Sequence, residues 1–343
     1  MTPNEFKVAV LGGGSFGTVV ANMAAVNGAH VQWWMRSEKQ LADIQATGIN
    51  TRYVPRYALH EGLHATNDLA AAVAQADIVF VAVPSKAVRV VLTNALPHLN
   101  PAAHLVSLTK GIEPDGFHLM SEVLHEVAPD HRFGVISGPN LAKEIAQGQL
   151  TGTVVASKSE ALRNDVHDVL SSTRFRVYTN PDVYGVELAG ALKNIYAIAS
   201  GMAAALGMGE NTRAMLMTRS LAEMSRFAVK LGANPLTFIG LAGVGDLIVT
   251  CTSPLSRNYR VGQAIGQGYT LKQAIKQLGE TAEGVNTLKV VKEKAEELGV
   301  YMPLVSGLYD VVHENRNVDL IAQRLMLGEK ASDVEFIFDS EKI

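Results

Sequence analysis

Hydrophobic positions divide the chain into two halves with different periodicity. In the first half, short apolar runs bounded by turn residues predict parallel strands that are buried on both faces. These predicted strands cover residues 8–11, 29–35, 78–83, 105–108, 133–137, 153–156 and 175–178. Helical patterns follow the first strand as far as Gly28, follow the 78–83 strand to about Leu99, and begin again at Ala142. Residues 51–66 lack periodicity and are predicted to form a loop.

The pattern becomes helical beyond Gly185, where no convincing strand is found. Helices are predicted over residues 186–206, 212–231, 256–267, 270–278 and 287–298, followed by a C-terminal helical group. We therefore predict an α/β domain over residues 1–185 and an all-α domain over residues 186–343.

A glycine-rich loop follows the first predicted strand directly, with the spacing Gly12-x-Gly14-x-x-Gly17. In a dinucleotide site Gly12 would permit the tight turn, Gly14 the approach of a pyrophosphate, and Gly17 close packing of helix on strand. The N-terminus of the next helix would offer free N–H groups to the phosphates. Glycines also mark ordinary turns, but the strand before and the helix after favour a dinucleotide cofactor.

The end of the second predicted strand carries Arg36, with Glu38 two positions later. At this place in dinucleotide-binding folds, an acid selects the free 2′-hydroxyl of the ribose and an arginine accommodates a 2′-phosphate. We therefore predict that the protein accepts NADP(H) and that NAD(H) also serves. The alternative is that Arg36 is a solvated loop residue.

Two lysines occupy unusual positions. Lys110 follows the end of a predicted strand, where doubly wound sheets bind ligands, although a lysine extending from a loop into solvent is an equal alternative. Lys193 lies in the 186–206 helix, which has hardly any polar face. Because a buried lysine is costly unless it is paired or deprotonated, Lys193 is a candidate proton donor and acceptor. Its alternative is a lysine that faces a solvated cleft.

Two further stretches suggest a binding site. Asp246 is surrounded by glycines in Gly240-Leu241-Ala242-Gly243-Val244-Gly245-Asp246, which indicates close packing around an acid. Ser256-Arg257-Asn258 then opens a predicted helix, where hydroxyl, guanidinium, amide and free N–H groups together would bind an oxyanion. The simpler alternative is a serine cap followed by an exposed arginine.

Composition narrows the class of protein. A chain of 343 residues with 48% hydrophobic residues is long enough for two domains. The net charge of −3 and the absence of a basic block argue against nucleic acid as a partner. A single cysteine, Cys251, suits a reducing compartment. Residues 1–7 are too short and polar for a signal peptide, and the apolar stretch 195–206 is shorter than the roughly 18 residues of a membrane span. We expect a cytoplasmic protein that is not embedded in a membrane and has no metal site.

Taken together, the motifs resemble bacterial NAD(P)-dependent sn-glycerol-3-phosphate dehydrogenases over essentially the whole chain. The motifs that carry the resemblance occur in this order: Gly14-Ser15-Phe16-Gly17-Thr18, Ala82-Val83-Pro84-Ser85, Thr109-Lys110-Gly111, Ser137-Gly138-Pro139, Ala142-Lys143-Glu144, Leu192-Lys193-Asn194, Gly245-Asp246-Leu247, Ser256-Arg257-Asn258 and Glu283-Gly284. The chain departs from the family pattern at Asn140, where many members have Ser or Thr, at Phe16, where Trp or Tyr is usual, and at Gly13, where Ala is usual.

The resemblance implies a Rossmann domain followed by a helical domain of the type found in 6-phosphogluconate-dehydrogenase-like enzymes. It implies reversible reduction of dihydroxyacetone phosphate to sn-glycerol 3-phosphate, which supplies glycerophospholipid synthesis. Lys193 would be the proton donor, with Lys110 and Asp246 beside it. Residues implied to surround the substrate are Lys110, Gly138, Asn140, Lys193, Asp246, Ser256, Arg257 and Asn258. Residues implied to touch the dinucleotide, besides the three glycines, are Ser15, Phe16, Arg36, Lys110, Ala142, Arg257 and Glu283.

Two rival functions remain at this stage. A different β-hydroxyacid-type dehydrogenase would share the glycine loop and Lys193-Asn194, but not Ser256-Arg257-Asn258 behind the glycine-rich stretch. A non-catalytic NADP(H) sensor could keep the loop, but it has no reason to place Lys193 in an apolar helix. The sequence leaves the oligomeric state open, with a homodimer among the options.

Overall fold

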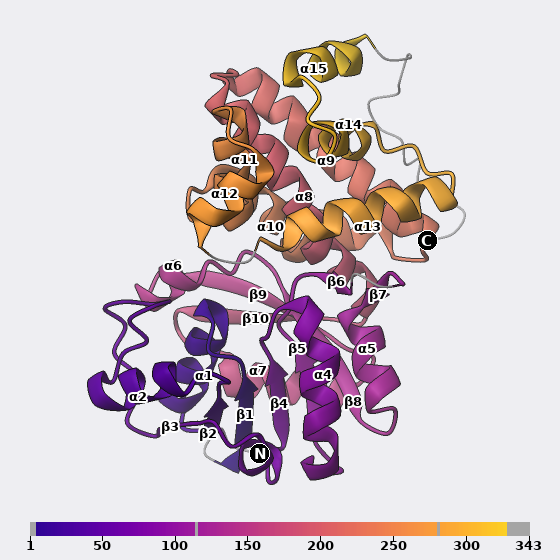
Figure 1. Cartoon of the computed structure of the whole chain (residues 1–343). Coiled ribbons are helices and arrows are strands. Elements are labelled where there is room, and N and C mark those ends of the chain that lie inside the picture. The colour runs from indigo at the N-terminus through magenta and orange to yellow at the C-terminus, as the bar shows by residue number, and fades with distance from the viewer. Residues whose placement is uncertain (1–4, 114–115, 280–281, 328–343) are drawn as a thin grey trace.

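The computed structural model describes residues 5–113, 116–279 and 282–327. Figure 1 shows a sheet with its flanking helices in the lower half and a group of helices above it. The strands are β1 (Lys7–Leu11), β2 (His30–Trp34), β3 (Leu63–Thr66), β4 (Ile78–Val81), β5 (His104–Ser107), β6 (Ile112–Glu113), β7 (His118–Leu119), β8 (Arg132–Ser137), β9 (Thr151–Ala156) and β10 (Phe175–Asn180). The helices of the lower half are α1 (Ser15–Val26), α2 (Glu38–Thr47), α3 (Leu69–Val73), α4 (Ser85–Ala95), α5 (Met120–Val127), α6 (Ala142–Ala146) and α7 (Glu160–Leu170).

Eight strands form one sheet in the order β3-β2-β1-β4-β5-β8-β9-β10, and neighbouring strands are parallel except β8 and β9. The chain proceeds outward from β1 to β3 on one side and from β4 to β5 and β8 on the other. The strand order therefore reverses between β1 and β4, which is where doubly wound sheets bind ligands. This confirms the predicted Rossmann domain, and the segments after β1, β4, β5 and β8 emerge at one edge.

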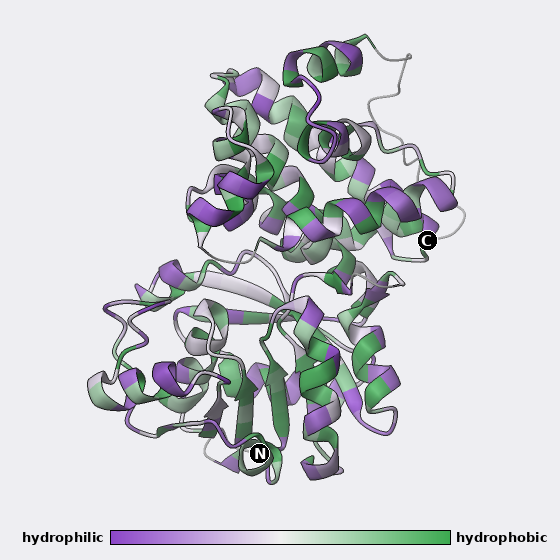
Figure 2. Cartoon of the chain, viewed as in Figure 1, coloured by the Kyte–Doolittle hydropathy of each residue, from purple (hydrophilic) through white to green (hydrophobic). Residues whose placement is uncertain are grey.

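The core of the lower half has two layers because the central strands bury both faces. Val8 and Val10 of β1 pack on one side in the apolar cluster that includes residues of α1 and α7. Ala9 and Leu11 pack on the other side with residues of α3, α4 and α5. Figure 2 shows these strands as hydrophobic, whereas hydrophilic residues lie on the outer helices. The continuous apolar runs in the sequence are therefore explained by burial on both faces.

The upper half consists of helices α8 (Val183–Ala205), α9 (Glu210–Lys230), α10 (Asp246–Thr252), α11 (Arg257–Gly266), α12 (Leu271–Leu278), α13 (Glu283–Glu297), α14 (Pro303–Val312) and α15 (Val318–Met326). Helix α8 is buried along almost its whole length and packs on α9, α10, α11, α13 and strand β8. It crosses α11 at very short range, because a Cβ atom on Gly201 would overlap the backbone O of Tyr259, and one on Gly262 would overlap the backbone O of Ile198. These two glycines thus set the separation of the helices.

Several predicted boundaries differ from the structure. The predicted loop 51–66 ends in β3, which is an edge strand with only partial burial and therefore lacks an apolar pattern. Helix α13 begins at Glu283 rather than at residue 287, and the glycine-rich stretch leads into α10, which was not predicted. The predicted division at residues 185 and 186 falls inside the first turn of α8. Residues 1–4 and 328–343, the ends of the two predicted domains, lie outside the described residues.

No helix among the described residues is long and apolar enough to cross a membrane.

Candidate functional site

The glycine-rich loop connects β1 to α1 at the point where the strand order reverses. A Cβ atom on Gly12, whose φ is +132°, would lie 2.6 Å from the backbone O of Ala82, and one on Gly17 would overlap the backbone O of Gly12. Gly14 is the N-cap residue of α1 and makes no side-chain cap hydrogen bond, and in the described part of the chain nothing beyond its own neighbours lies within 4 Å of its Cβ position. Gly12 and Gly17 are therefore required by packing inside the protein. Gly14 leaves the helix N-terminus open to a phosphate.

Two amide side chains that were not predicted from the sequence support this loop. Gln40 Nε2 donates to the backbone O of Gly13 at 2.6 Å, and Asn50 Nδ2 donates to the same oxygen at 3.0 Å. Asn50 also donates to Thr18 Oγ1 at 2.8 Å and is only 1% exposed. Nothing in the local sequence around Gln40 or Asn50 signals these contacts, because they depend on how α2 and the following loop fold back.

The other predicted cofactor residues of the lower half lie around the same loop. Ser15 begins α1, and its Oγ donates to the backbone O of Tyr53 at 3.4 Å. Phe16 and Ala142 are partly buried against the apolar cluster on the α1 side of the sheet. Arg36 is exposed just beyond β2, next to Ser37, the N-cap residue of α2. The structure thus places these four residues at the cofactor edge of the sheet, and their contacts with a dinucleotide remain predictions.

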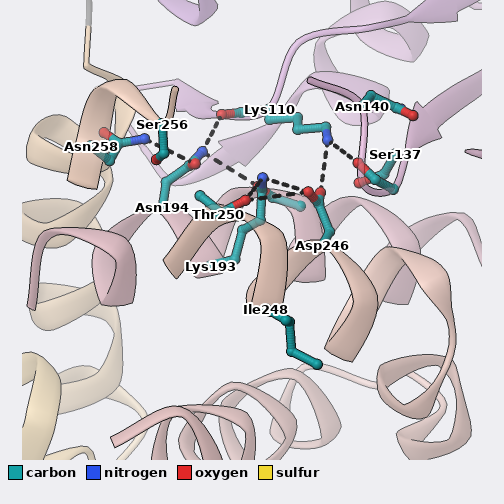
Figure 3. A network of polar contacts seen from close by, with 12 residues as sticks. Lys110, Ser137, Asn140, Lys193, Asn194, Asp246, Ile248, Thr250, Ser256 and Asn258 are labelled. Atoms are coloured by element: carbon teal, nitrogen blue, oxygen red, sulfur yellow. Dashed lines mark hydrogen bonds and ion pairs between the residues drawn. The ribbon is translucent and has the colours of Figure 1, made fainter. Parts of the chain in front are cut away.

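The two lysines singled out in the sequence meet at one carboxylate, which lies in the middle of the network in Figure 3. Lys193 Nζ donates to Asp246 Oδ1 at 2.7 Å, and Lys110 Nζ donates to Asp246 Oδ2 at 2.7 Å. Lys110 Nζ also donates to the backbone O of Gly138 at 2.7 Å. Helix α8, helix α10 and the segment after β5 each supply one charged group, and the segment after β8 supplies the carbonyl. Residues far apart in the sequence therefore form one buried site.

Thr250 is a further member of this network, and it was not predicted from the sequence. Its Oγ1 accepts a hydrogen bond from Lys193 Nζ at 2.5 Å and lies 3.3 Å from Asp246 Oδ1, where it can donate. Asp246 and Thr250 are one turn apart on α10, so both face Lys193. The i, i+4 spacing of an acid and a threonine was the available signal, but it appeared in a stretch that was not predicted to be helical.

The charges at the centre do not cancel. Two ammonium groups and one carboxylate leave one net positive charge in a site where the side chains of Lys193 and Asp246 are 7% and 1% exposed. Burial lowers the pKa of Lys110 to about 8, and Asp246 opposes this change. An ammonium has three N–H groups, and Lys193 directs two of them at Asp246 and Thr250 within the described part of the chain. The site is therefore suited to an oxyanion that forms beside Lys193.

Amide groups connect α8 to α11 and α13 next to the lysines. Asn194 Nδ2 donates to the backbone O of Lys110 at 3.2 Å, and Asn258 Nδ2 donates to Asn194 Oδ1 at 2.9 Å. Asn258 Oδ1 in turn accepts from the backbone N of Gly284 at 3.0 Å. These two hydrogen bonds use one N–H and one lone pair of the Asn258 amide, half of its capacity, inside the protein. A contact of Asn258 with a phosphate oxygen of the substrate would use the second N–H of its amide.

The start of α11 has the geometry of a helix cap. Ser256 is the N-cap residue, is 4% exposed, and accepts a hydrogen bond from the backbone N of Tyr259 at 3.3 Å. Arg257, the first residue of the helix, has an exposed side chain. The cap predicted as the simpler alternative is therefore confirmed. A cap and a phosphate site are compatible, because a helix N-terminus has four N–H groups without an intrahelical partner and one cap side chain satisfies only part of them.

Two other predicted residues are arranged differently from the lysines. Asn140 Nδ2 donates to Thr153 Oγ1 at 2.8 Å, and Figure 3 shows its labelled side chain directed away from Lys193. Glu283, at the start of α13, accepts hydrogen bonds from the Oγ of Ser85 at 2.7 Å and from its backbone N at 3.3 Å. Glu283 therefore connects the upper half to the start of α4. The roles of Asn140 toward substrate and of Glu283 toward the dinucleotide remain predictions.

Comparisons with known proteins agree over nearly the whole chain. Residues 7–163 match the family model for the N-terminus of NAD-dependent glycerol-3-phosphate dehydrogenase, and residues 182–323 match the model for its C-terminus. The chain is 59% identical to the NAD(P)+ glycerol-3-phosphate dehydrogenase of Ectopseudomonas mendocina over 96% of this chain and 97% of the relative. It is 57% identical to that of Alcanivorax borkumensis, covering 98% of each.

The fold comparison gives the same result. The crystal structure of glycerol-3-phosphate dehydrogenase from Coxiella burnetii matches with a TM-score of 0.91 and 37% identity, covering 95% of this chain and 100% of that one. By its sequence and its architecture, the chain belongs to the family of NAD-dependent glycerol-3-phosphate dehydrogenases.

Proposed function

We propose that this protein catalyses the reversible NAD(P)H-dependent reduction of dihydroxyacetone phosphate to sn-glycerol 3-phosphate. The observation that carries the proposal is the pair of lysines that share Asp246 at the edge of the sheet where the glycine loop opens. The open N-terminus of α1 at Gly14 fits the pyrophosphate of a dinucleotide. When bound there, the dinucleotide supplies the hydride that is added to C2 of the substrate.

Lys193 is the group that moves the proton. As an ammonium it holds the carbonyl oxygen of the substrate, stabilises the negative charge that develops on it, and donates a proton to it. In the direction of oxidation, neutral Lys193 accepts the same proton. Asp246 and Thr250 orient Lys193, because both contact its Nζ and both lie on the rigid turn of α10. Lys110 contributes a second positive charge and is held against Gly138.

The phosphate of the substrate binds at the start of α11. Arg257 can contact two phosphate oxygens at once, and the N–H groups that follow Ser256 add the positive end of the helix dipole. With the phosphate fixed at this end, C2 is placed beside Lys193 rather than left free to rotate.

A single assay tests this function. Oxidation of NADPH, followed by its absorbance, is measured with dihydroxyacetone phosphate and with unphosphorylated dihydroxyacetone. We expect rapid oxidation with the phosphorylated substrate and slow oxidation with the other. Equal rates with both would favour a different dehydrogenase of the same superfamily, and no oxidation with either would favour a non-catalytic sensor.

The product of this reaction is the glycerol phosphate from which glycerophospholipids are made, so the enzyme would supply phospholipid synthesis. We also infer a cytoplasmic location, supported by the single buried cysteine, Cys251. A homodimer stays a prediction, to be tested by measuring the mass of the protein in solution.

Arg36→Ala is expected to weaken NADPH binding by about tenfold to a hundredfold while leaving NADH binding almost unchanged. The reason is that only NADPH carries the 2′-phosphate, and Arg36 is exposed at the strand end where that phosphate would lie. Dissociation constants for the two cofactors, measured from nucleotide fluorescence, test this. An equal loss for both would remove Arg36 from the proposed role.

The rate of reduction is expected to fall above about pH 8, where Lys110 loses its proton. Below that pH Lys110 is charged and balances the developing alkoxide, and above it the positive charge is lost. Lys110→Arg should abolish this decline, even at a lower overall rate, because a guanidinium stays charged. The measurement is kcat/KM from pH 6.5 to 9.5 for both proteins. A decline that persists in Lys110→Arg would assign it to another group.

A further inference from the structure

The segment that carries Lys110 is attached to α8 at both of its ends. At the start, Asn194 Nδ2 donates to the backbone O of Lys110 at 3.2 Å. At the far end, after the hairpin of β6 and β7, Ser121 in the first turn of α5 is bound by Glu187. Glu187 and Asn194 both belong to α8, the helix that also carries Lys193.

Glu187 is a buried acid that binds a helix N-terminus. Glu187 is 4% exposed. Its carboxylate accepts hydrogen bonds from the Ser121 backbone N at 3.0 Å and from Ser121 Oγ at 2.5 Å. Leu119 precedes α5 as its N-cap residue, and a leucine side chain offers no hydrogen-bond acceptor to the first turn. The backbone N–H of Ser121, in the first turn of α5, therefore obtains its acceptor from a different helix.

Burying a carboxylate at this place carries a large desolvation free energy. Its surroundings are apolar, because Leu119 and Ile112 of the hairpin pack in one cluster with Leu188 and Leu192 of α8. Burial raises the pKa of Glu187 to about 7, while the hydrogen bonds from Ser121 lower it and Glu122 adds to the rise. If the residue only filled space, a leucine would stabilise the fold more than a glutamate does. The role of the acid is therefore directional: it fixes where α5 begins relative to α8.

We propose that Glu187 is a positioning residue that holds Lys110 in register with Asp246 and Lys193 by fastening the start of α5 to α8. Strand β7 runs directly into α5 and pairs with β6, whose Ile112 lies two residues after Lys110, so a shift of the helix start is passed on to Lys110. The attachment by Asn194 alone holds only one end of the segment. This inference rests on the proposed role of Lys110 in the reaction.

The test is Glu187→Leu, which fills the volume but cannot accept a hydrogen bond. We expect kcat/KM for dihydroxyacetone phosphate to fall by about tenfold to a hundredfold, as for other small displacements of a catalytic group. The decline of the rate near pH 8 should also move, because the environment of Lys110 changes. The dissociation constant of NADPH should stay unchanged. Glu187→Gln keeps an acceptor of the same size and should restore most of the activity.

Glu122→Leu is the matched control for Glu187→Leu. Glu122 accepts a hydrogen bond from the backbone N of Leu119 at 2.7 Å, so it binds the same helix terminus, but it lies on α5 itself and does not connect α5 to α8. The chemical change is identical to that in Glu187→Leu. We expect Glu122→Leu to keep the kcat/KM and the pH profile of the wild type.

A folded Glu187→Leu protein with wild-type kcat/KM and an unmoved decline near pH 8 would overturn the proposal. If Glu187→Leu does not fold, Ser121→Ala takes its place, since it removes only the shorter of the two contacts and should give a smaller loss in the same direction. Wild-type behaviour of Ser121→Ala would then overturn the proposal. A failure of the proposed role of Lys110 in the reaction can be distinguished from this outcome. In that case Lys110→Met would have a normal kcat/KM, independently of any substitution at Glu187.

Discussion

Lys193→Met is expected to lower kcat by about 10²-fold to 10⁴-fold, because methionine keeps the length and apolar stem of lysine but cannot transfer a proton. The position should tolerate the change, since α8 is apolar and buried around it. Charge balance favours folding as well, because Asp246 keeps its ion pair with Lys110. The dissociation constant of NADPH should remain close to that of the wild type, which separates lost chemistry from lost binding.

The control for Lys193→Met is Lys289→Met, the same change at an exposed lysine of α13. It should leave kcat unchanged. Steady-state turnover and the unfolding temperature are measured for both variants. Near-normal turnover in a folded Lys193→Met protein would reject Lys193 as the acid and base, and Lys110 would become the candidate.

Arg257→Ala is expected to lower kcat/KM for dihydroxyacetone phosphate by about a hundredfold, which corresponds to the loss of one strong charge-assisted hydrogen bond. The kcat/KM for unphosphorylated dihydroxyacetone, which is already low in the wild type, should hardly change. The loss should appear partly in kcat, because binding the distant phosphate places C2 beside Lys193. Arg257→Lys should recover only part of the loss, since an ammonium keeps the charge but not the planar pair of donors.

The informative quantity is the ratio of kcat/KM for the two substrates, compared between wild type and Arg257→Ala. Arg260→Ala is the control, because Arg260 is also exposed on α11 but lies beyond its first residues. A ratio that does not move in Arg257→Ala would mean that Arg257 does not recognise the phosphate. The start of α11 would then serve as a cap alone.

Much of the fold was predictable because its signals are local. A buried parallel strand is a continuous apolar run, and the spacing of Gly12, Gly14 and Gly17 between strand and helix defines the loop. The strand β3 was missed for the opposite reason: it is short, lies at the edge of the sheet and is only partly buried. Helix α10 was missed because it follows a glycine-rich stretch, and glycine is a poor helix former.

The residues of the site could be predicted from the sequence better than the contacts between them. Lys193 stands out because a lysine in an apolar helix is unusual, and Lys110 because of its place after a strand. That both donate to the same carboxylate follows only from the packing of α8 against α10. Asn50 and Gln40 carry no local signal, since their contact with Gly13 depends on the path of the chain after β2.

The position of α8 also bears on how the protein unfolds. This helix packs on strand β8 of the sheet and, through Gly201 and Gly262, directly on the backbone of α11. It is apolar on nearly every side, so it has no face that water would stabilise if either neighbour were removed. Neither half can unfold without exposing the apolar surface of α8 to water. The free energy of that exposure therefore opposes the unfolding of both halves. Two regions that are separate in sequence and architecture are thereby joined into one cooperative unit, which would melt in a single transition.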